Sequence, residues 1–287
     1  MITVIIPSFN RAHLLHKTIP SYCQTLVSRI ILVDDCSSDN TTEVVAELQK
    51  QISILEYIRL PKNSRQPTAQ NVALEKVDTE WVYFGDDDSV LYPNTIQRLF
   101  DTIAEHKADI CGAKALYMAF GDSLDDIDGF VERSHKILPK DLPIVELDTL
   151  KVHFDSFVEK PIEVPFCHAS ALVNTELAKK VMFDPMYVGN AYREETDFFM
   201  GCSKIGAKIM YDSRAMQINL PPNLATGGAR SSTKMKYRYY MIVNNWRFLN
   251  KHYSFLKQKY GLRSNKYAMQ FQFMISFVSR AFKRVLN

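Results

Sequence analysis

The sequence predicts an α/β fold, with a mostly parallel sheet flanked by helices and followed by a C-terminal helical extension. Two observations support this. Short apolar segments, rich in β-branched and aromatic residues, alternate with segments of helical period over roughly the first 120 residues. Polar residues follow the apolar segments at the points where parallel strands would end.

The predicted elements follow this alternation. Strands are expected at 3–7, 29–35, 54–60 and 81–87, with helices between them at 12–24, 40–51 and 67–77. A helix at 92–106 and a strand at 108–120 follow. Residues 121–165, rich in acids and prolines, are interpreted as a variable insertion. We then expect a strand at 166–173, helices at 174–181 and 193–206, a strand at 207–212, and helical structure from 234 onward.

Composition excludes several classes of protein. A hydrophobic content of 46% in 287 residues is typical of a globular protein that buries a substantial core. The five cysteines are widely spaced and form no CxxC pair, which argues against a disulfide framework or a zinc site. The N-terminus lacks a signal-peptide pattern, and no apolar run approaches the length of about 18 residues that a membrane span needs. We therefore expect a cytoplasmic protein.

Charge is distributed unevenly along the chain. Residues 213–287 contain 14 Lys and Arg and no Asp or Glu, whereas residues 1–212 carry a net charge of −11. Within residues 234–287, basic and aromatic residues interleave. A basic amphipathic helix indicates peripheral contact with the inner face of an anionic membrane. Packing on the acidic part of the chain, or in a homodimer, is the alternative interpretation, and nucleic acid is disfavoured because no recognition motif is present.

Three consecutive carboxylates, Asp86, Asp87 and Asp88, follow the fourth predicted strand. Like charges this close repel one another and resist desolvation, so the triplet needs a compensating cation or a solvated loop. The segments 8–11 and 34–39 follow two other predicted strands. Because ligands bind at the carboxyl ends of parallel strands, all three segments are expected to line one crevice.

Five segments, in order, resemble the family 2 glycosyltransferases of GT-A fold: "TVIIPSFNR", "ILVDDCSSDNT", "WVYFGDDDSVLYP", "REETDFF" followed by "GAKIMYD", and "LPPNLATGGAR". The resemblance implies a catalytic domain at 1–230, with a donor half at about 1–120 and an acceptor half at about 121–230, and an extension at 231–287. It implies an inverting enzyme that transfers a sugar from a nucleoside diphosphate sugar to an acceptor hydroxyl of a glycan, glycolipid or polysaccharide precursor.

The resemblance also implies a divalent metal, Mn²⁺ or Mg²⁺, bound by the D-x-D segment. Asp88 falls at the metal-binding position and Asp86 is the first acid of the motif. Such a metal neutralises the charge that develops on a diphosphate leaving group. Many relatives carry a His ligand where this chain has Asn219, whose amide oxygen is a weaker ligand for a hard cation.

A nucleotide site follows from the same resemblance, with UDP or dTDP favoured over GDP. Asp35 matches the acid that accepts a hydrogen bond from the base. Arg11 suits phosphate through its rigid donor fork, and Arg230 lies in a segment expected to close over the donor. The other expected nucleotide-binding residues are Pro7, Phe9, Asn10, Asp86 and Asp87. Arg65 is a candidate to replace a family Arg that this chain lacks at Gln70.

A carboxylate must take the proton of the attacking hydroxyl. Glu195 stands where the family has an Asp base, and Glu194 and Asp197 are the substitutes; at helical spacing 194 and 197 share a face and 195 is turned away. Two other functions are alternatives. A sugar nucleotidyltransferase would need a Gly-rich loop where this chain has "PSFNR". A degenerate scaffold that binds nucleotide or glycan without transfer stays open because of Asn219 and Gln70.

Overall fold

A computed structural model describes residues 1–228 and 233–285, with side chains except those of Lys234 and 278–285. The four predicted N-terminal strands are confirmed as β1 (Ile2–Ser8), β2 (Val27–Asp34), β3 (Leu55–Arg59) and β4 (Trp81–Phe84). They form the parallel part of the sheet in the order β3-β2-β1-β4. Their β-branched and aromatic side chains are buried on both faces of the sheet, as expected for parallel strands covered by helices.

The helices between these strands are also confirmed, with shorter bounds. They are α1 (Ala12–Thr18), which continues into a 3₁₀ turn, η1 (Ile19–Tyr22), then α2 (Thr41–Gln49) and α3 (Gln66–Glu75). Pro20 lies in the first turn of η1, and the change to 3₁₀ geometry there ends the predicted helix at residue 22 instead of 24. Asn40 is the N-cap residue of α2.

The second half makes the sheet mixed, whereas the sequence predicted mostly parallel pairing. After α4 (Thr95–His106) and β6 (Ile110–Tyr117), strand β10 (Ala171–Asn174) inserts antiparallel between β4 and β6. The long β11 (Ile209–Asn219) then pairs parallel with β6, and antiparallel with β5 (Ser89–Leu91) and β9 (Ile162–Glu163). Strand β5 was not predicted. It places the aspartate triplet in the turn between two strands.

The insertion at 121–165 has little regular structure. It contains the 3₁₀ turn η2 (Leu124–Asp126), helix α5 (Ile127–Arg133), and the two-stranded sheet of β7 (Val145–Glu146) and β8 (Lys151–Val152). Its apolar side chains Ile144, Leu150 and Phe154 are buried in the main core. The insertion therefore packs on the domain.

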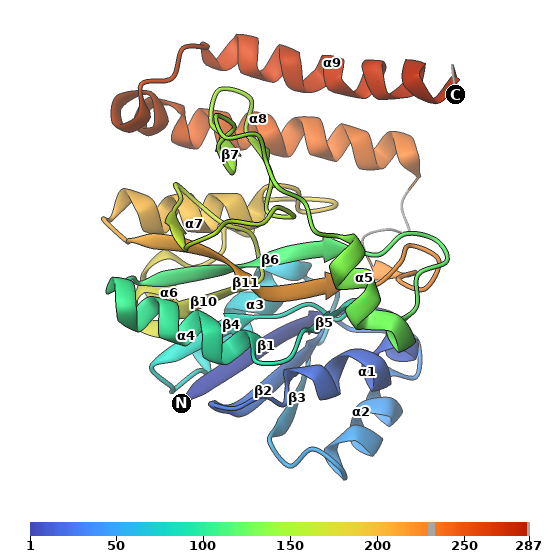
Figure 1. The fold of residues 1–287 in the computed structure, drawn as a ribbon. Coiled ribbons are helices and arrows are strands. Elements are labelled where there is room, and N and C mark those ends of the chain that lie inside the picture. The colour runs from blue at the N-terminus through green and yellow to red at the C-terminus, as the bar shows by residue number, and fades with distance from the viewer. Residues whose placement is uncertain (229–232, 286–287) are drawn as a thin grey trace.

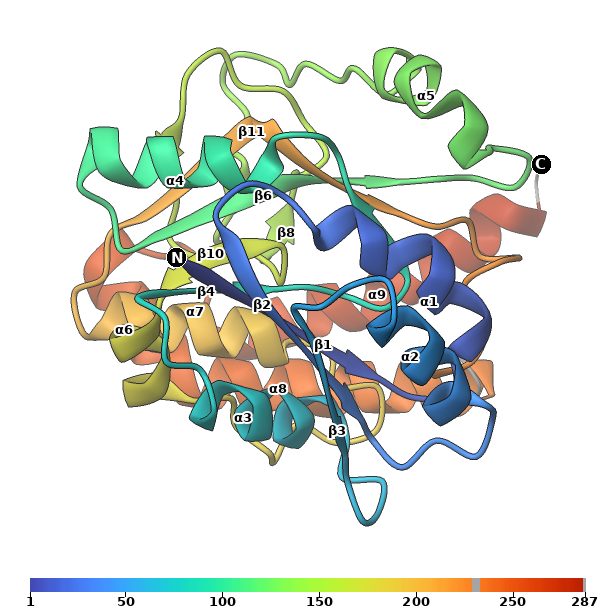
Figure 2. The ribbon, with the colours of Figure 1, turned by 90° about the horizontal axis from the view of Figure 1, so that it is seen from below.

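The two sheet faces bury separate apolar clusters. On one face lie α3, α6 (Thr175–Val181) and α7 (Glu194–Lys204), and on the other lie α1, α2 and α4. Figure 2 shows α6 and α7 on the opposite side of the sheet from α4.

The C-terminal extension forms two long helices, α8 (Lys234–Tyr260) and α9 (Lys266–Val285), stacked in layers beyond α7 (Figure 1). Helix α8 packs on the domain because Phe248, Leu249 and Leu256 are fully buried in its core. Helix α9 is outermost and exposes Tyr267, Phe271, Met274 and Ile275. Across the described residues, no helix combines the length and apolarity that crossing a membrane requires.

Candidate active site

A cavity of about 330 Å³ opens where β1, β2 and β4 end, as the sequence predicted for this edge. We call it the first cavity. The strand-end loops contribute Phe9, Arg11, Asp35 and Asp87 to its wall. Further wall residues come from the end of β1, the loop before α3 and its first residue, the segment before α7, the loop before α8, and α8 itself; they are Pro7, Ser8, Asn63, Arg65, Gln66, Gly189, Asn190, Ala191, Gly228, Lys236 and Tyr240.

Asp35 lies at the rim of β2 and holds the loop that leads into α3. Its two carboxylate oxygens accept hydrogen bonds from the backbone N–H groups of Ser64 and Arg65, at 2.5 and 2.7 Å. Burial raises the pKa of Asp35, and these two hydrogen bonds act against that shift. Arg65 itself has a positive φ of 72° and lines the first cavity. Asp35 therefore positions Arg65 at the cavity wall.

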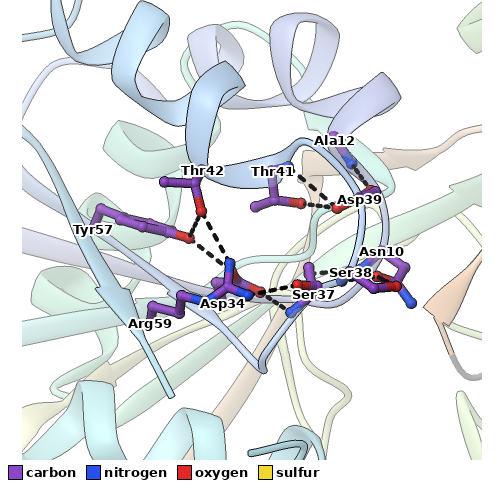
Figure 3. A network of polar contacts seen from close by, with 10 residues as sticks. All are labelled: Asn10, Ala12, Asp34, Ser37, Ser38, Asp39, Thr41, Thr42, Tyr57 and Arg59. Atoms are coloured by element: carbon purple, nitrogen blue, oxygen red, sulfur yellow. Dashed lines mark hydrogen bonds and ion pairs between the residues drawn. The ribbon is translucent and has the colours of Figure 1, made fainter. Parts of the chain in front are cut away.

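Asn10 does not line the first cavity, contrary to the expectation that it sits against the nucleoside. Its side-chain oxygen accepts a hydrogen bond from the Ser38 N–H at 2.7 Å, and its own N–H donates to the Ser37 hydroxyl at 2.8 Å (Figure 3). Its φ of 53° is left-handed, a region that Asn tolerates well. Asn10 therefore joins the loop after β1 to the loop after β2.

Asp34 braces the second of these loops. Its carboxylate accepts hydrogen bonds from Tyr57, Arg59 and the Ser37 N–H, and its side chain is fully buried (Figure 3). The network fixes the end of β2 and so the position of Asp35 beside it.

The aspartate triplet forms a tight turn under Tyr22. The Tyr22 hydroxyl donates to the Asp86 carbonyl oxygen at 2.8 Å and accepts from the Asp86 N–H at 3.0 Å. A Cβ added at Gly85 would lie 2.8 Å from the Tyr22 ring, so glycine is needed at this close approach. The turn is anchored on its far side by the Leu220 N–H, which donates to the Asp88 carbonyl oxygen at 2.9 Å.

Arg11 supplies a cation to the triplet. One guanidinium nitrogen, Nη1, bonds to Asp87 and lies 3.1 Å from an oxygen of Asp88. Burial lowers the pKa of Arg11, but the charges of Asp87 and Asp88 outweigh burial and raise that pKa above its ordinary value. The compensating cation that the sequence called for is therefore, in part, a side chain of the protein.

Asp86 is left in a more acidic environment. Its side chain accepts one hydrogen bond, from the Gln217 amide at 3.0 Å. Burial first, and then the charges of Glu195 and Asp88, raise the pKa of Asp86 well above its usual range. Such a cluster of hard oxygen donors fits a divalent metal that neutralises it.

Few side chains are available as ligands for a metal. Within the described part of the chain, no group of three or more His, Cys, Asp or Glu side chains is arranged as metal ligands. Asn219 lies on β11 opposite Ser89, the residue after Asp88, and its side-chain N–H₂ donates to the Leu116 carbonyl oxygen at 3.1 Å. The two aspartates fit Mg²⁺ or Mn²⁺ in the mode where phosphates and water complete the coordination.

A second cavity, of about 630 Å³, adjoins the first. Gln66, Asn190 and Ala191 line both cavities. The remaining wall comes from the end of β6, the β7–β8 hairpin, the start of α7 and helix α9; its residues are Tyr117, Thr149, Leu150, Lys151, Val152, Tyr192, Arg193, Glu194, Glu195, Thr196, Gln272, Phe273 and Ser276.

Glu194 and Glu195 begin helix α7 in the wall of the second cavity. Burial raises the pKa of Glu195 to about 7, although the Ala169 N–H donates to its carboxylate at 3.3 Å and acts against this shift. Burial and the charges of Glu195 and Asp86 raise the pKa of Glu194 well above its usual range. One Glu194 oxygen is buried without a hydrogen-bond partner. A carboxylate with a pKa near 7 can accept a proton at neutral pH.

Asp197 is placed elsewhere, which corrects its assignment as a candidate base. Its carboxylate accepts hydrogen bonds from His252 Nε2 at 2.6 Å, Lys251 at 2.8 Å and Tyr187 at 3.0 Å. Burial raises its pKa, but the bonds from His252 and Lys251 outweigh burial and lower it. One helical turn separates Asp197 from Glu194, and the side chain joins α7 to α8 instead of facing the cavity.

Several wall residues were not identified from the sequence. Lys236 and Tyr240 of α8 line the first cavity, and Gln272 and Phe273 of α9 line the second. The absence of acids from residues 213–287, opposite an acidic domain, was a signal for this packing, and it was compatible with a membrane as well. Arg230 lies outside the described residues.

Comparison with known proteins relates part of this chain to glycosyltransferases. A family model described as "Glycosyl transferase family 2" matches residues 3–126. The poly(ribitol-phosphate) beta-N-acetylglucosaminyltransferase TarP of Staphylococcus aureus is 32% identical over 114 residues, 38% of this chain and 35% of that protein. The GalNAc(5)-diNAcBac-PP-undecaprenol beta-1,3-glucosyltransferase of Campylobacter jejuni is 32% identical over 158 residues, 53% of this chain and 48% of that protein. The matched region thus spans less than half the length of either relative.

Solved structures show the same fold. The crystal structure of S. aureus TarS 1-349 in complex with UDP-GlcNAc superposes with a TM-score of 0.60 at 19% identity, covering 90% of this chain and 74% of that one. The mannosyltransferase PcManGT from Pyrobaculum calidifontis, in complex with GDP-Man and Mn²⁺, gives a TM-score of 0.59 at 15% identity, covering 88% of this chain and 64% of that one. Residues 3–126 of this chain thus match the glycosyl transferase family 2 model, and its mixed α/β architecture is similar to that of GT-A structures such as TarS.

Proposed function

We propose that this protein transfers a sugar from a nucleoside diphosphate sugar to an acceptor hydroxyl, with inversion at the anomeric carbon. The observation that carries the proposal is the pair of adjoining cavities. One is lined by the loops of the family motif, and the other holds a carboxylate of raised pKa. A donor in the first cavity and an acceptor in the second would meet at Gln66, Asn190 and Ala191.

The first cavity is proposed as the donor site. Pro7, Phe9 and Asp35 would hold the nucleoside, and Arg11 and Arg65 lie where a diphosphate needs cations. UDP or dTDP is proposed over GDP on the family resemblance, and the TarS structure with UDP-GlcNAc supports UDP. Because the PcManGT structure contains GDP-Man, GDP is included in the binding test described below.

Asp86 and Asp88 are proposed to hold Mg²⁺ or Mn²⁺ together with the donor phosphates. When bound, the metal would stabilise the negative charge on the departing diphosphate. Asn219 lies beside this turn, and its side-chain N–H₂ is already bonded to a carbonyl oxygen. We therefore propose that Asn219 is a weaker metal ligand than a histidine at this position would be.

Glu195 is proposed as the general base, with Glu194 as the alternative. As the acceptor oxygen bonds to the anomeric carbon, the bond from that carbon to the diphosphate breaks. The hydroxyl proton passes to the Glu195 carboxylate, which at a pKa of about 7 is sufficiently ionised and sufficiently basic at neutral pH.

The acceptor is proposed to be a glycan or a lipid-linked precursor, as the names of the relatives suggest. Residues 1–230 would form the catalytic domain. Within 231–287, α8 and α9 would complete both cavities while α9 contacts an anionic membrane surface. Support for membrane contact comes from Tyr267, Phe271 and Ile275, which form an exposed apolar stripe on a helix without acids.

The donor site is tested first, by calorimetric titration of UDP, dTDP and GDP into the protein with and without Mn²⁺. We expect one nucleotide to bind, with an affinity that falls about 100-fold when metal is left out or in Asp88→Ala. Asp101→Ala, on an exposed part of α4, is the matched control and should bind like wild type. Absence of binding by all three nucleotides would contradict the proposal. Binding without sugar transfer would favour the alternative function, a degenerate scaffold that binds nucleotide or glycan without transfer.

Membrane contact is tested separately by co-sedimentation with vesicles of phosphatidylglycerol or phosphatidylcholine. We expect binding to the anionic vesicles alone, reduced severalfold in Phe271→Glu. Phe120→Glu, at another exposed phenylalanine, is the control. Equal sedimentation of wild type and Phe271→Glu would argue that α9 does not contact the membrane.

A further inference from the structure

We propose that Arg11 is a resident counter-ion of the aspartate turn, which a divalent metal displaces from Asp88 and which the diphosphate of the donor then binds. The proposal rests on the proposed function, because it assigns Arg11 and Asp87 a role in the loading of that same site. Asp87 becomes the residue that holds Arg11 beside the turn.

The contacts place Arg11 in competition with a metal. Its Nη1 atom touches carboxylate oxygens of both Asp87 and Asp88, and all three side chains are largely buried, with 11%, 6% and 10% of their surface exposed. Asp88 is the residue that the family pattern assigns to the metal. A guanidinium within 3.1 Å of its oxygen neutralises charge that the metal would otherwise neutralise.

The charge balance makes such a counter-ion necessary. Asp86, Asp87 and Asp88 are consecutive, and Glu195 lies close enough to raise the pKa of Asp86. Buried carboxylates without a cation are costly, so the turn needs positive charge before any ligand arrives. Within the described residues, Arg11 is the cation that makes ion pairs with this turn.

The neighbouring loop limits where Arg11 can move. A Cβ at Gly228 would lie 3.0 Å from the Cζ and Nε atoms of Arg11, and one at Gly227 would lie 2.3 Å from the Asn10 carbonyl oxygen. The loop is therefore packed directly on Arg11. The side that remains open is the first cavity, which Arg11 lines, so a released guanidinium faces the place where a diphosphate would bind.

The arrangement makes metal and nucleotide binding depend on each other. Metal alone must remove Arg11 from Asp88 and leave its guanidinium with one carboxylate fewer. When a diphosphate is present, the guanidinium gains phosphate oxygens in exchange, and its fork geometry suits them. Metal should therefore bind weakly alone and more tightly with the nucleotide, and the coupling must be reciprocal.

The test measures free Mn²⁺ by electron paramagnetic resonance in titrations of wild type and Arg11→Ala, each with and without UDP. This readout does not depend on activity. Without nucleotide, we expect Arg11→Ala to bind Mn²⁺ roughly tenfold more tightly than wild type. Addition of UDP should tighten Mn²⁺ binding roughly tenfold in wild type and clearly less in Arg11→Ala.

Arg65→Ala is the matched control, because it removes a cation from the same cavity wall, whereas the ion pairs that the described residues make with the aspartate turn come from Arg11. It should bind Mn²⁺ alone like wild type. Arg11→Gln, which keeps a long polar side chain, replaces Arg11→Ala if that variant does not fold. Equal or weaker binding of Mn²⁺ alone by both Arg11 variants would overturn the proposal. Failure of wild type to bind any nucleotide would instead contradict the proposed function, since the comparison in Mn²⁺ alone needs no nucleotide.

Discussion

The two adjoining cavities are built in different ways. Part of the first wall comes from loops that directly follow strands β1, β2 and β4, and the rest comes from the segments before α3 and α7 and from α8. The wall of the second comes from a hairpin, the start of α7 and the last helix, α9. The topology of a parallel sheet brings the strand-end residues of the first wall together, because the strand ends must meet at one edge. The second wall includes Gln272, Phe273 and Ser276 of α9, so it is complete only once α9 has packed beside the hairpin and the start of α7.

The two cavities also treat charge differently. In the first, Arg11 pairs with acids of the triplet, and Arg65 stands beside Asp35. In the second, the cations of the wall are already engaged: Lys151 with Glu146, and Arg193 with Asn245 and Leu150. Among the described residues, three cations and two acids line the first cavity, which suits an anion, whereas two cations and two acids line the second. The two acids of the second cavity, Glu194 and Glu195, suit it to a proton transfer.

The difference is tested most strongly at Glu195. We expect Glu195→Gln to lower the transfer rate about 1,000-fold, while nucleotide binding stays within about twofold of wild type. The wild-type rate should rise with pH through about 7, because the base must be ionised and the pKa of Glu195 is raised to about 7. Rates from pH 5.5 to 8.5 check both points.

Glu194→Gln is the matched variant in the same turn of α7, and it should lower the rate less than tenfold. The opposite ranking of the two variants would transfer the role of base to Glu194. A wild-type rate that stays flat between pH 6 and 8 would argue against a titrating Glu195.

A second prediction separates Asp197 from its two neighbours on α7. Asp197→Ala should lower the free energy of unfolding by about 2–3 kcal/mol, because it leaves His252 and Lys251 without their buried partner, and Lys251 is partly solvated. The specific rate of the folded variant should change little. Urea unfolding measures the first effect.

The control for Asp197 is Asp184→Ala, which removes the other, more exposed partner of Lys251. It should cost less than about 1 kcal/mol. Since the pKa of Asp197 is lowered in the folded state, the stability that this acid contributes is present above the pKa of the unfolded chain and is lost as pH falls through the lower folded value. A loss of activity in Asp197→Ala at full stability would return this residue to the active site.

The smallest expected effect concerns helix α9. Phe273 stacks on Tyr192 with ring centroids 5.6 Å apart and lines the second cavity. Phe273→Ala should raise KM for a soluble acceptor analogue about tenfold and leave KM for the donor unchanged, because apolar contact is lost on one side only. Phe271→Ala, on the exposed face of the same helix, should leave both constants unchanged. A change in the donor KM alone would show that the two cavities do not divide the substrates in this way.

Residues close together in the chain were predicted well. Strands β1 to β4 and the loops after them follow from local apolar patterns, and the triplet was expected beside Arg11 because both follow parallel strands. In the structure, Asp34 and Asn10 fix these loops by accepting hydrogen bonds from backbone N–H groups. Short Asp and Asn side chains commonly make such bonds in turns. Local sequence patterns and the topology of a parallel sheet were therefore sufficient to predict strands β1 to β4 and the loops that follow them.

Residues distant in the chain were predicted poorly. Asp197 looked equivalent to Glu195, since both are acids in the first turn of one helix. What distinguishes them is His252, 55 positions later, which no local pattern connects to Asp197. Strand β5 is three residues long, and its pairing with β11 spans more than 120 residues. The direction of β10 likewise depends on its neighbours, because a four-residue apolar segment carries no information on orientation.

The wall shared by the two cavities has a consequence for inhibitor design. Gln66, Asn190 and Ala191 contact whatever fills either cavity. A single molecule that joins a nucleotide to an acceptor mimic would need only a short linker to occupy both. Such a bisubstrate compound loses its translational freedom once instead of twice, so its affinity can exceed that of either half by orders of magnitude.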